Sequence, residues 1–286
     1  MIEFVNAFFD PDNAFLRIAI YVATLSSISF GIIGTYVVTR RISYLAGAIS
    51  HCVFGGIGAG LYIQKEVGIS WFEPMYGAVI SAIMAAIIIG LVSLYARQRE
   101  DTVIGALWAV GMAAGLIFVD LTPGYFDITS YLFGDILLIS MKDLWMVVFL
   151  DVLVVAVSIY FYNILLAVCF DQEFAGLRGV YSGAFYILLL CLTSLTIVLL
   201  VRVVGIVMVI ALLTLPAAVA GQFSRRLWQM MVLAVIFCMI FNWTGLALSY
   251  SMKLSSGPTI IIVAGITYIV TISLLKLRKK IKFIKK

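Results

Sequence analysis

Charge and histidine are both scarce in this sequence. Charged residues make up 12% of the 286 residues and 64% are hydrophobic, whereas soluble domains have roughly 25% and 45–50%. So few charges could not cover the surface of a soluble fold of this length. A hydrocarbon solvent removes that need, and a helix in hydrocarbon satisfies its own backbone hydrogen bonds. The composition therefore predicts an all-α, polytopic membrane protein, a bundle of transmembrane helices.

Cysteine pairs, nucleotide motifs and proton-relay chains are absent as well. Cys52, Cys169, Cys191 and Cys238 lie far apart without a CxxC pair, so we interpret them as small apolar residues. The Walker-type loop GxxxxGK[ST] that cradles a nucleotide does not occur. Asp151 is the one acid well inside an apolar run, so the dense acid and histidine chains of proton relays are missing too. A transporter built from this chain would take its energy from another polypeptide.

Nine windows contain the ~20 largely apolar residues that a helix needs to cross a bilayer. Only Arg202 and the small residues around it separate the sixth window from the seventh, so the sequence predicts eight or nine crossings. The acidic N-terminus lacks the basic start of a signal peptide, and we expect the first span to be retained. The windows are 14–38, 44–63, 75–95, 103–119, 144–168, 182–201, 203–222, 228–250 and 258–276.

The placement of lysine and arginine predicts the orientation of the bundle. With nine spans and the N-terminus outside, the inner segments hold 14 of these residues and the outer loops hold 4. The C-terminus is then cytoplasmic, and the basic tail 277–286 would lie beside anionic lipid heads. The net charge of +5 needs no nucleic acid to explain it. We expect one transmembrane domain over 1–286, with its longest outer loop at 120–143 and its longest cytoplasmic loop at 169–181.

The only histidine, His51, lies in a run of glycine and alanine. Residues four apart share a helix face, so Gly47, His51 and Gly55 form one stripe, and Gly56 and Gly60 lie on the neighbouring one. Small residues at this spacing let another helix approach closely. The imidazole is therefore predicted to face a helix interface or a cavity and not lipid.

Two interpretations of His51 remain open from residue type alone. The ring either bonds a carbonyl of the facing helix and fixes packing, or it contacts a transported ion, with the Ser50 hydroxyl on an adjoining face. Imidazole binds zinc, copper, iron and nickel well. One histidine cannot make the four-ligand site usual for structural zinc, but an ion in transit must also leave its site.

Five stretches, in the same order along the chain, resemble one family: the permease subunits of bacterial ABC importers for zinc, manganese or iron. Singly each stretch is a weak signal, but five in order on the expected sides of the membrane are specific. They are RRISYLAGAISH at 40–51, EDTVIGALWAVGMAAGL at 100–116, SYLFGDIL at 130–137, FDQEFAGLRGV at 170–180 and VVGIVMVIALLTLPAAVA at 203–220.

The resemblance implies a complex in the bacterial inner membrane. Two permeases, alike or related, would stand side by side with cytoplasmic ATPases and an extracytoplasmic metal-binding protein. The chain itself would be no enzyme and would hold no permanent cofactor. A divalent metal ion would pass through it into the cytoplasm by alternating access. The rival hypotheses are a stand-alone metal channel or carrier and, less favoured, an intramembrane lipid-modifying enzyme.

The resemblance also implies roles for single residues. His51 matches the histidine of the translocation path, and Asp135 matches an outer position near which an ion would enter, although the residue type of Asp135 favours a turn or helix-capping role over an ion contact. Pro216 is expected to kink its span and free carbonyls, or only to pack. The segment that docks on the ATPase is matched by Asp171, Glu173, Ala175 and Gly179.

One departure from the family bears on the cargo. The family's usual aspartate, four residues before the histidine, is Gly47 here, and its Leu-Pro-Gly is Phe54-Gly55-Gly56. Loss of the carboxylate removes a hard oxygen ligand from the face of His51. Because manganese favours oxygen ligands, the sequence favours zinc.

Overall fold

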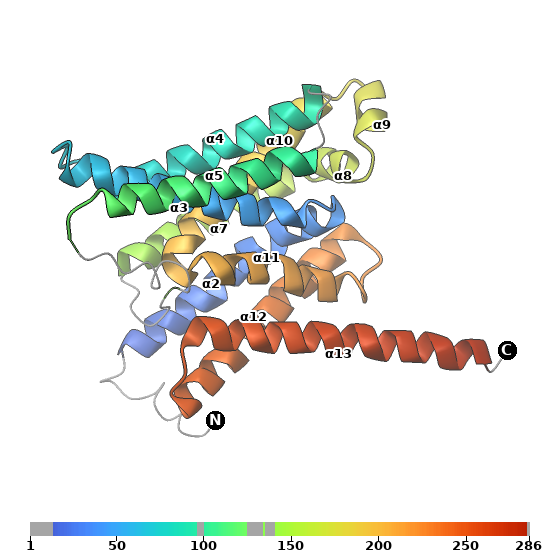
Figure 1. The fold of residues 1–286 in the computed structure, drawn as a ribbon. Coiled ribbons are helices and arrows are strands. Elements are labelled where there is room, and N and C mark those ends of the chain that lie inside the picture. The colour runs from blue at the N-terminus through green and yellow to red at the C-terminus, as the bar shows by residue number, and fades with distance from the viewer. Residues whose placement is uncertain (1–13, 96–99, 125–133, 135–140, 285–286) are drawn as a thin grey trace.

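The computed structural model describes residues 14–95, 100–124, 134 and 141–284. Every regular element in these ranges is a helix, so the prediction of an all-α bundle is confirmed (Figure 1). The helices are α2 (Ala14–Thr39), α3 (Ser43–Lys65), α4 (Pro74–Tyr95), α5 (Glu100–Asp120), α7 (Met141–Tyr160), α8 (Tyr162–Phe170), α9 (Gln172–Leu177), α10 (Ser182–Val204), α11 (Ile206–Ala220), α12 (Leu227–Met252) and α13 (Ser256–Ile284).

Eight of the described helices are long and apolar enough to cross a bilayer. The ninth apolar helix, α11, has only 15 residues. At ~1.5 Å per residue it is about 22 Å long, which is less than the ~30 Å of the hydrocarbon core. The break between the sixth and seventh windows falls at Gly205, whose φ of +81° favours glycine. Arg202, the expected boundary, lies in the last turn of α10.

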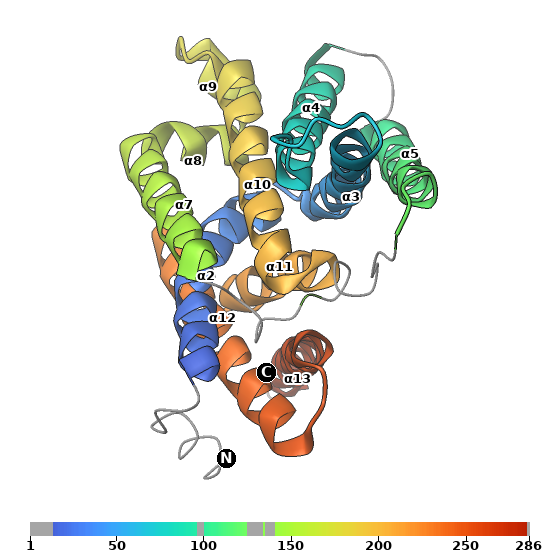
Figure 2. The ribbon, with the colours of Figure 1, turned by 90° about the vertical axis from the view of Figure 1, so that its left-hand side faces the viewer.

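The predicted window 144–168 contains a spanning helix, but the predicted end of that span was wrong, because the helix stops at Tyr160. α7 ends at Tyr160 and α8 begins at Tyr162. Phe161 between them has φ −102° and ψ 16°, and Figure 2 shows α8 turned sharply from the direction of α7. Apolar composition continues through the bend, so hydropathy alone could not locate it.

α3 lies between α4 and α5, and α10 packs against α4 and α3 (Figure 2). α2 packs against α7, α11 and α12, while α13 packs against α11 and α12. Within the described ranges α5 contacts mainly α3, with a smaller contact to α4. The position of α5 therefore depends chiefly on its seam with α3.

Polar side chains join α2 to two neighbouring helices inside the bundle. Asp151 of α7 is 5% exposed and its Oδ1 accepts hydrogen bonds from Ser29 Oγ at 2.5 Å and from the Ser29 N–H at 3.2 Å. Asn242 of α12 donates to the Ala23 carbonyl at 3.0 Å and to Ser27 Oγ at 3.1 Å. Buried polar groups need such partners, so the intramembrane acid pairs with a helix and does not reach the membrane surface.

The α2–α3 turn, α9 and the start of α12 meet at one end of the bundle. Arg40 Nη2 donates to Gln172 Oε1 at 2.6 Å, and Thr39 Oγ1 lies 3.8 Å from Met230 Sδ. α13 extends beyond the bundle at this same end (Figure 1). The residues that the sequence assigns to the cytoplasmic side thus gather together.

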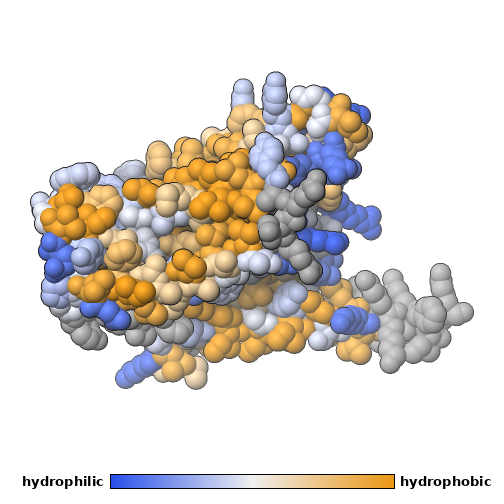
Figure 3. All heavy atoms as spheres, turned by 45° about the horizontal axis from the view of Figure 1, so that its top comes forward, coloured by the Kyte–Doolittle hydropathy of each residue, from blue (hydrophilic) through white to orange (hydrophobic). Residues whose placement is uncertain are grey.

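Charged and polar side chains gather toward the two ends of the bundle. At the end opposite α9, Arg202 of α10 and Asp143 of α7 form an ion pair with 3.0 Å between Nε and Oδ1. Figure 3 shows apolar side chains across the middle of the visible face and hydrophilic ones toward its two ends. This distribution suits a multi-pass membrane protein.

Candidate metal path and coupling segment

The glycines of α3 let two helices approach its backbone from different sides. A Cβ placed on Gly55 would lie 2.7 Å from the Gly111 carbonyl oxygen of α5. A Cβ on Gly60 would lie 2.8 Å from Pro74 Cα of α4, and Gly56 also faces the α4 backbone. The two neighbouring stripes of small residues therefore pack against two different helices. The stripe with Gly55 contacts α5, and the stripe with Gly56 and Gly60 contacts α4.

His51 lies at the seam between α3 and α5 and is half-buried. Its ring stacks on the indole of Trp108, with centroids 4.8 Å apart and planes inclined by 24°. Its Nδ1 lies 3.1 Å from Sδ of Met112, one helical turn further along α5. The imidazole is thus held against a neighbouring helix by one aromatic and one sulfur contact.

Ser50 is fully buried and points elsewhere. Its hydroxyl donates to the Ala46 carbonyl of its own helix at 2.7 Å. Within the described residues Ser50 makes no hydrogen bond to His51. The structure therefore does not join these two predicted path residues into one polar group.

Trp108 fills the space beside Gly47. A Cβ on Gly47 would lie 2.5 Å from Cζ3 and 2.7 Å from Cη2 of the indole, so a carboxylate could stand here only if the ring moved. Sequence reasoning missed both Trp108 and Met112. The available signal was their spacing of four, which puts them on one helix face.

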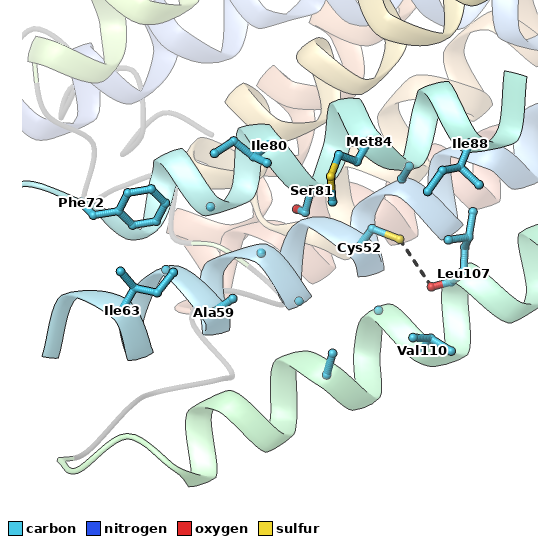
Figure 4. A pocket seen from close by; sticks show the side chains of 17 residues that line it. Cys52, Ala59, Ile63, Phe72, Ile80, Ser81, Met84, Ile88, Leu107 and Val110 are labelled. Carbon is cyan, nitrogen blue, oxygen red and sulfur yellow. Dashed lines mark hydrogen bonds between the residues drawn. The ribbon is translucent and has the colours of Figure 1, made fainter. Parts of the chain in front are cut away.

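An apolar groove lies on the other flank of the same seam. Figure 4 shows α4 and α5 spreading apart over α3, and the groove between them has a volume of about 400 Å³. Ile80, Met84 and Val110 belong to its walls. Cys52 donates to the Leu107 carbonyl there, with 3.4 Å between Sγ and the oxygen. The described lining contains no carboxylate and no imidazole, so the groove is separate from the His51 contact.

The remaining residues that the sequence singles out near the path are Asp135 and Pro216. Asp135 falls outside the described residues, but Gly134 before it has φ +65°, and a Cβ on it would lie 2.5 Å from Gly205 N. The outer segment therefore touches the junction of α10 and α11 at this point. Pro216 is buried inside α11, which continues through it. A proline cannot donate to the Leu212 carbonyl four residues earlier.

The predicted coupling residues surround the short helix α9. Asp171 is its N-cap, and its Oδ1 accepts the Phe174 N–H at 2.9 Å. Glu173 in the first turn is exposed, whereas Ala175 is buried. Gly179 has φ +80° with open space around it. Asp171 therefore shapes the segment, and Glu173 remains accessible to a partner.

Apolar side chains project from the same segment at the end of the bundle. Phe170 is 68% exposed, Leu177 87% and Tyr181 85%. Arg40 ties α9 back to the end of α2 through Gln172. A small anchored helix thus presents exposed apolar groups outside the membrane-spanning part of the bundle.

Comparison with known proteins identifies the family. The model of the ABC 3 transport family matches residues 12–275. A probable metal transport system membrane protein of Chlamydia pneumoniae is 37% identical over 244 residues, 85% of this chain and 83% of that one. The manganese transport system membrane protein MntC of Halalkalibacterium halodurans is 34% identical over 261 residues, 90% of this chain and 87% of that one. The solved structure of PsaBC from Streptococcus pneumoniae in complex with Fab matches with a TM-score of 0.82 and 26% identity, covering 95% of each chain.

These matches agree with the fold and with the five stretches described above. The family match spans nearly the whole chain, and the structural match extends over the same bundle. The resemblance to ABC permeases is confirmed, and ATP hydrolysis belongs to a separate subunit. The chain belongs to the ABC 3 transport family, as a multi-pass membrane permease subunit of a metal ABC transporter and not an enzyme.

Proposed function

We propose that this permease passes a divalent transition-metal ion into the cytoplasm by alternating access, with Zn²⁺ as the favoured cargo. A separate ATPase drives the cycle, an extracytoplasmic binding protein delivers the ion, and a second permease, identical or related, completes the path. The complex lies in the bacterial inner membrane. The N-terminus is outside, and the α9 end of the bundle faces the cytoplasm with the end of α13.

The observation that carries this proposal is the placement of the only histidine. His51 is half-buried within a span and is held by Trp108 and Met112 of α5. An imidazole inside a membrane protein marks a functional site by default. Imidazole also suits zinc and iron. Ser50 is proposed to anchor the turn of α3 that carries His51, and Asp135 to act as the outer contact.

The choice of cargo rests on the donor atoms. Manganese is the competing ion, because four similar proteins carry manganese transport or import names. Position 47 is glycine, so α3 offers no carboxylate one turn before His51. Manganese prefers carboxylate and water oxygens, whereas zinc accepts nitrogen and sulfur. Zinc is therefore favoured over manganese.

We propose that α9 docks on the ATPase. A short helix with exposed apolar side chains can insert into a groove of a soluble partner. Leu177 and Phe174 supply such side chains, and Glu173 adds an exposed charge. Movement of the docked helix would then reach α2 through the Arg40–Gln172 hydrogen bond.

Uptake into proteoliposomes tests the function. The permease, reconstituted with its ATPase and binding protein, should accumulate Zn²⁺ only when ATP is supplied. His51→Ala should lower uptake while the yield of the complex is unchanged. Gly105→Ala is the control, because a Cβ at Gly105 meets nothing within 4 Å. Full Zn²⁺ uptake by the His51→Ala variant would show that His51 has no role in the translocation path. Zn²⁺ flux without the ATPase would identify a stand-alone channel or carrier.

A further inference from the structure

The contact between His51 and Met112 combines two metal-binding donor types. The imidazole Nδ1 and the thioether Sδ lie 3.1 Å apart. A thioether is a weak hydrogen-bond acceptor, but it is a soft metal ligand of the kind that selects Cu(I) and Zn²⁺. The two side chains belong to different helices and lie 61 residues apart in sequence. Their meeting is therefore a product of how α3 and α5 pack.

Glycines fix this packing closely. Gly55 of α3 lies against the Gly111 carbonyl, and a Cβ on Gly111 would lie 2.9 Å from Cys52 Cα. Backbones in such contact leave little freedom to slide or separate. The seam flanks His51 and Met112, so the two backbones that carry the donors are held at nearly constant positions.

Within the described ranges, the side chains that contact His51 are Trp108 and Met112, and neither carries a carboxylate. Trp108 covers the imidazole and fills the volume beside Gly47. Among the described residues no three of His, Cys, Asp and Glu come together as a metal-binding group. The side-chain contact between α3 and α5 at this point thus pairs one nitrogen with one sulfur.

The separation of the two donors is close to what a bound zinc ion needs. With Zn–N near ~2.1 Å and the ~2.3 Å Zn–S distance of a cysteine thiolate taken as the shortest value for the thioether, donors at a tetrahedral angle would stand at least roughly 3.6 Å apart. That is about 0.5 Å more than the 3.1 Å observed. Methionine has three rotatable side-chain bonds, so a small rotation of Met112 opens this space.

We propose that His51 and Met112 form a paired nitrogen–sulfur contact for the transported ion, and that Met112 makes the path prefer Zn²⁺ to Mn²⁺. This inference rests on the proposed function, which it deepens by naming a specificity-determining residue. Two protein donors leave the other coordination positions of the ion to water. Binding of this kind is strong enough for the ion to enter the site and weak enough for it to leave. Trp108 is a positioning residue that orients the ring and excludes a carboxylate.

Uptake by the reconstituted transporter tests the preference. Zn²⁺ and Mn²⁺ are offered in separate assays to wild type, Met112→Leu and Met84→Leu. Met84 is the matched control, because it is a methionine of a neighbouring span that lines the apolar groove. Met112→Leu should lower Zn²⁺ uptake at least on the order of tenfold, since even the loss of a group behind a metal ligand costs that much, and should leave Mn²⁺ uptake nearly unchanged. An unchanged ratio of Zn²⁺ to Mn²⁺ uptake in Met112→Leu would overturn the proposal.

X-ray absorption at the zinc edge reports which atoms surround the bound zinc. A purely structural role of Met112 in helix packing would not change this signal. The permease–ATPase complex is loaded with ZnCl₂ in each variant, and sulfur scattering is compared. The sulfur contribution should persist in Cys52→Ala and Met84→Leu and fall in Met112→Leu. Equal sulfur scattering in all variants would overturn the nitrogen–sulfur pair. If wild type shows no ATP-driven uptake of any metal, the proposed function fails, and the absorption result still decides whether the pair binds zinc.

Discussion

The indole of Trp108 lies in the space that a side chain at Gly47 would need. A Cβ at that position would stand 2.5 Å from Cζ3, while the same indole stacks on His51 with centroids 4.8 Å apart. One residue of α5 thus determines what position 47 can carry and how the imidazole one turn later is oriented. The chemistry of α3 at this level of the membrane depends on α5.

A methyl group at Gly47 should be costly. We expect Gly47→Ala to destabilise the purified protein by ~1–3 kcal/mol, because the new Cβ forces the indole aside. Thermal unfolding in detergent measures this, with Gly105→Ala on the open face of α5 as the control. Adding Trp108→Ala to Gly47→Ala should recover part of the stability that the methyl group costs. Equal melting temperatures for Gly47→Ala and Gly105→Ala would contradict the packing described.

A carboxylate at position 47 should change the cargo once space is made for it. The double variant Gly47→Asp with Trp108→Ala places an oxygen donor one turn from His51. We expect its Mn²⁺ uptake to rise several-fold relative to Zn²⁺, since manganese prefers oxygen ligands. Trp108→Ala alone is the control for loss of the ring. Identical metal preferences in the single and double variants would exclude position 47 as a determinant of selectivity.

The hydrogen bonds between Ser29 and Asp151 should stabilise the packing of α2 on α7. We expect Ser29→Ala to cost ~0.6–2 kcal/mol, the range found for interhelical hydrogen bonds in membranes. Asp151→Asn keeps an acceptor oxygen and should cost less than Asp151→Leu. Thr267→Val is the control, since within the described residues that hydroxyl donates to the Val263 carbonyl of its own helix and links no second helix. Thermal unfolding in detergent ranks the stability of the variants. An unchanged melting temperature in Ser29→Ala would argue against a stabilising role of the Ser29–Asp151 hydrogen bonds.

Asp171 should support ATPase binding by capping α9, and its charge should not be needed for contact with the partner. Its carboxylate caps α9 by accepting the Phe174 N–H, and asparagine caps helices as well as aspartate does. Asp171→Asn should therefore retain the ATPase in co-purification. Asp171→Ala should lower the yield of complex, because losing a cap costs about 1 kcal/mol and α9 has only 6 residues. Equal loss in both variants would indicate that the charge itself contacts the partner.

The exposed apolar tip of α9 should contribute directly to docking. Leu177 is 87% exposed, so Leu177→Glu should leave the fold intact and reduce co-purification of the ATPase roughly tenfold, as removal of an interface anchor does. Leu121 is 58% exposed and follows α5 at the opposite end of the bundle. Leu121→Glu should retain the ATPase fully. Normal recovery of the complex with Leu177→Glu would dismiss α9 as the docking element.

Hydropathy located the spans but not their interruptions. The windows around α2, α3, α4 and α5 agree with the helices to within a few residues, because each is bounded by charge, proline or glycine. The bend at Phe161 has no such mark, since apolar residues continue on both sides of it. Gly205 ends α10 through its φ of +81°. The sequence placed the boundary between the sixth and seventh windows at Arg202, but α10 accommodates this charge in its last turn.

The amino-acid order alone determined that the chain lies in a membrane, which segments are apolar enough to enter it, and that its single imidazole sits on a face of small residues. Those properties follow from local composition and from helical periodicity. The tertiary structure decided which partners meet that imidazole. Met112 and Trp108 reach His51 across 61 and 57 residues of chain, and such contacts depend on which helices pack together and how closely their glycines let them approach.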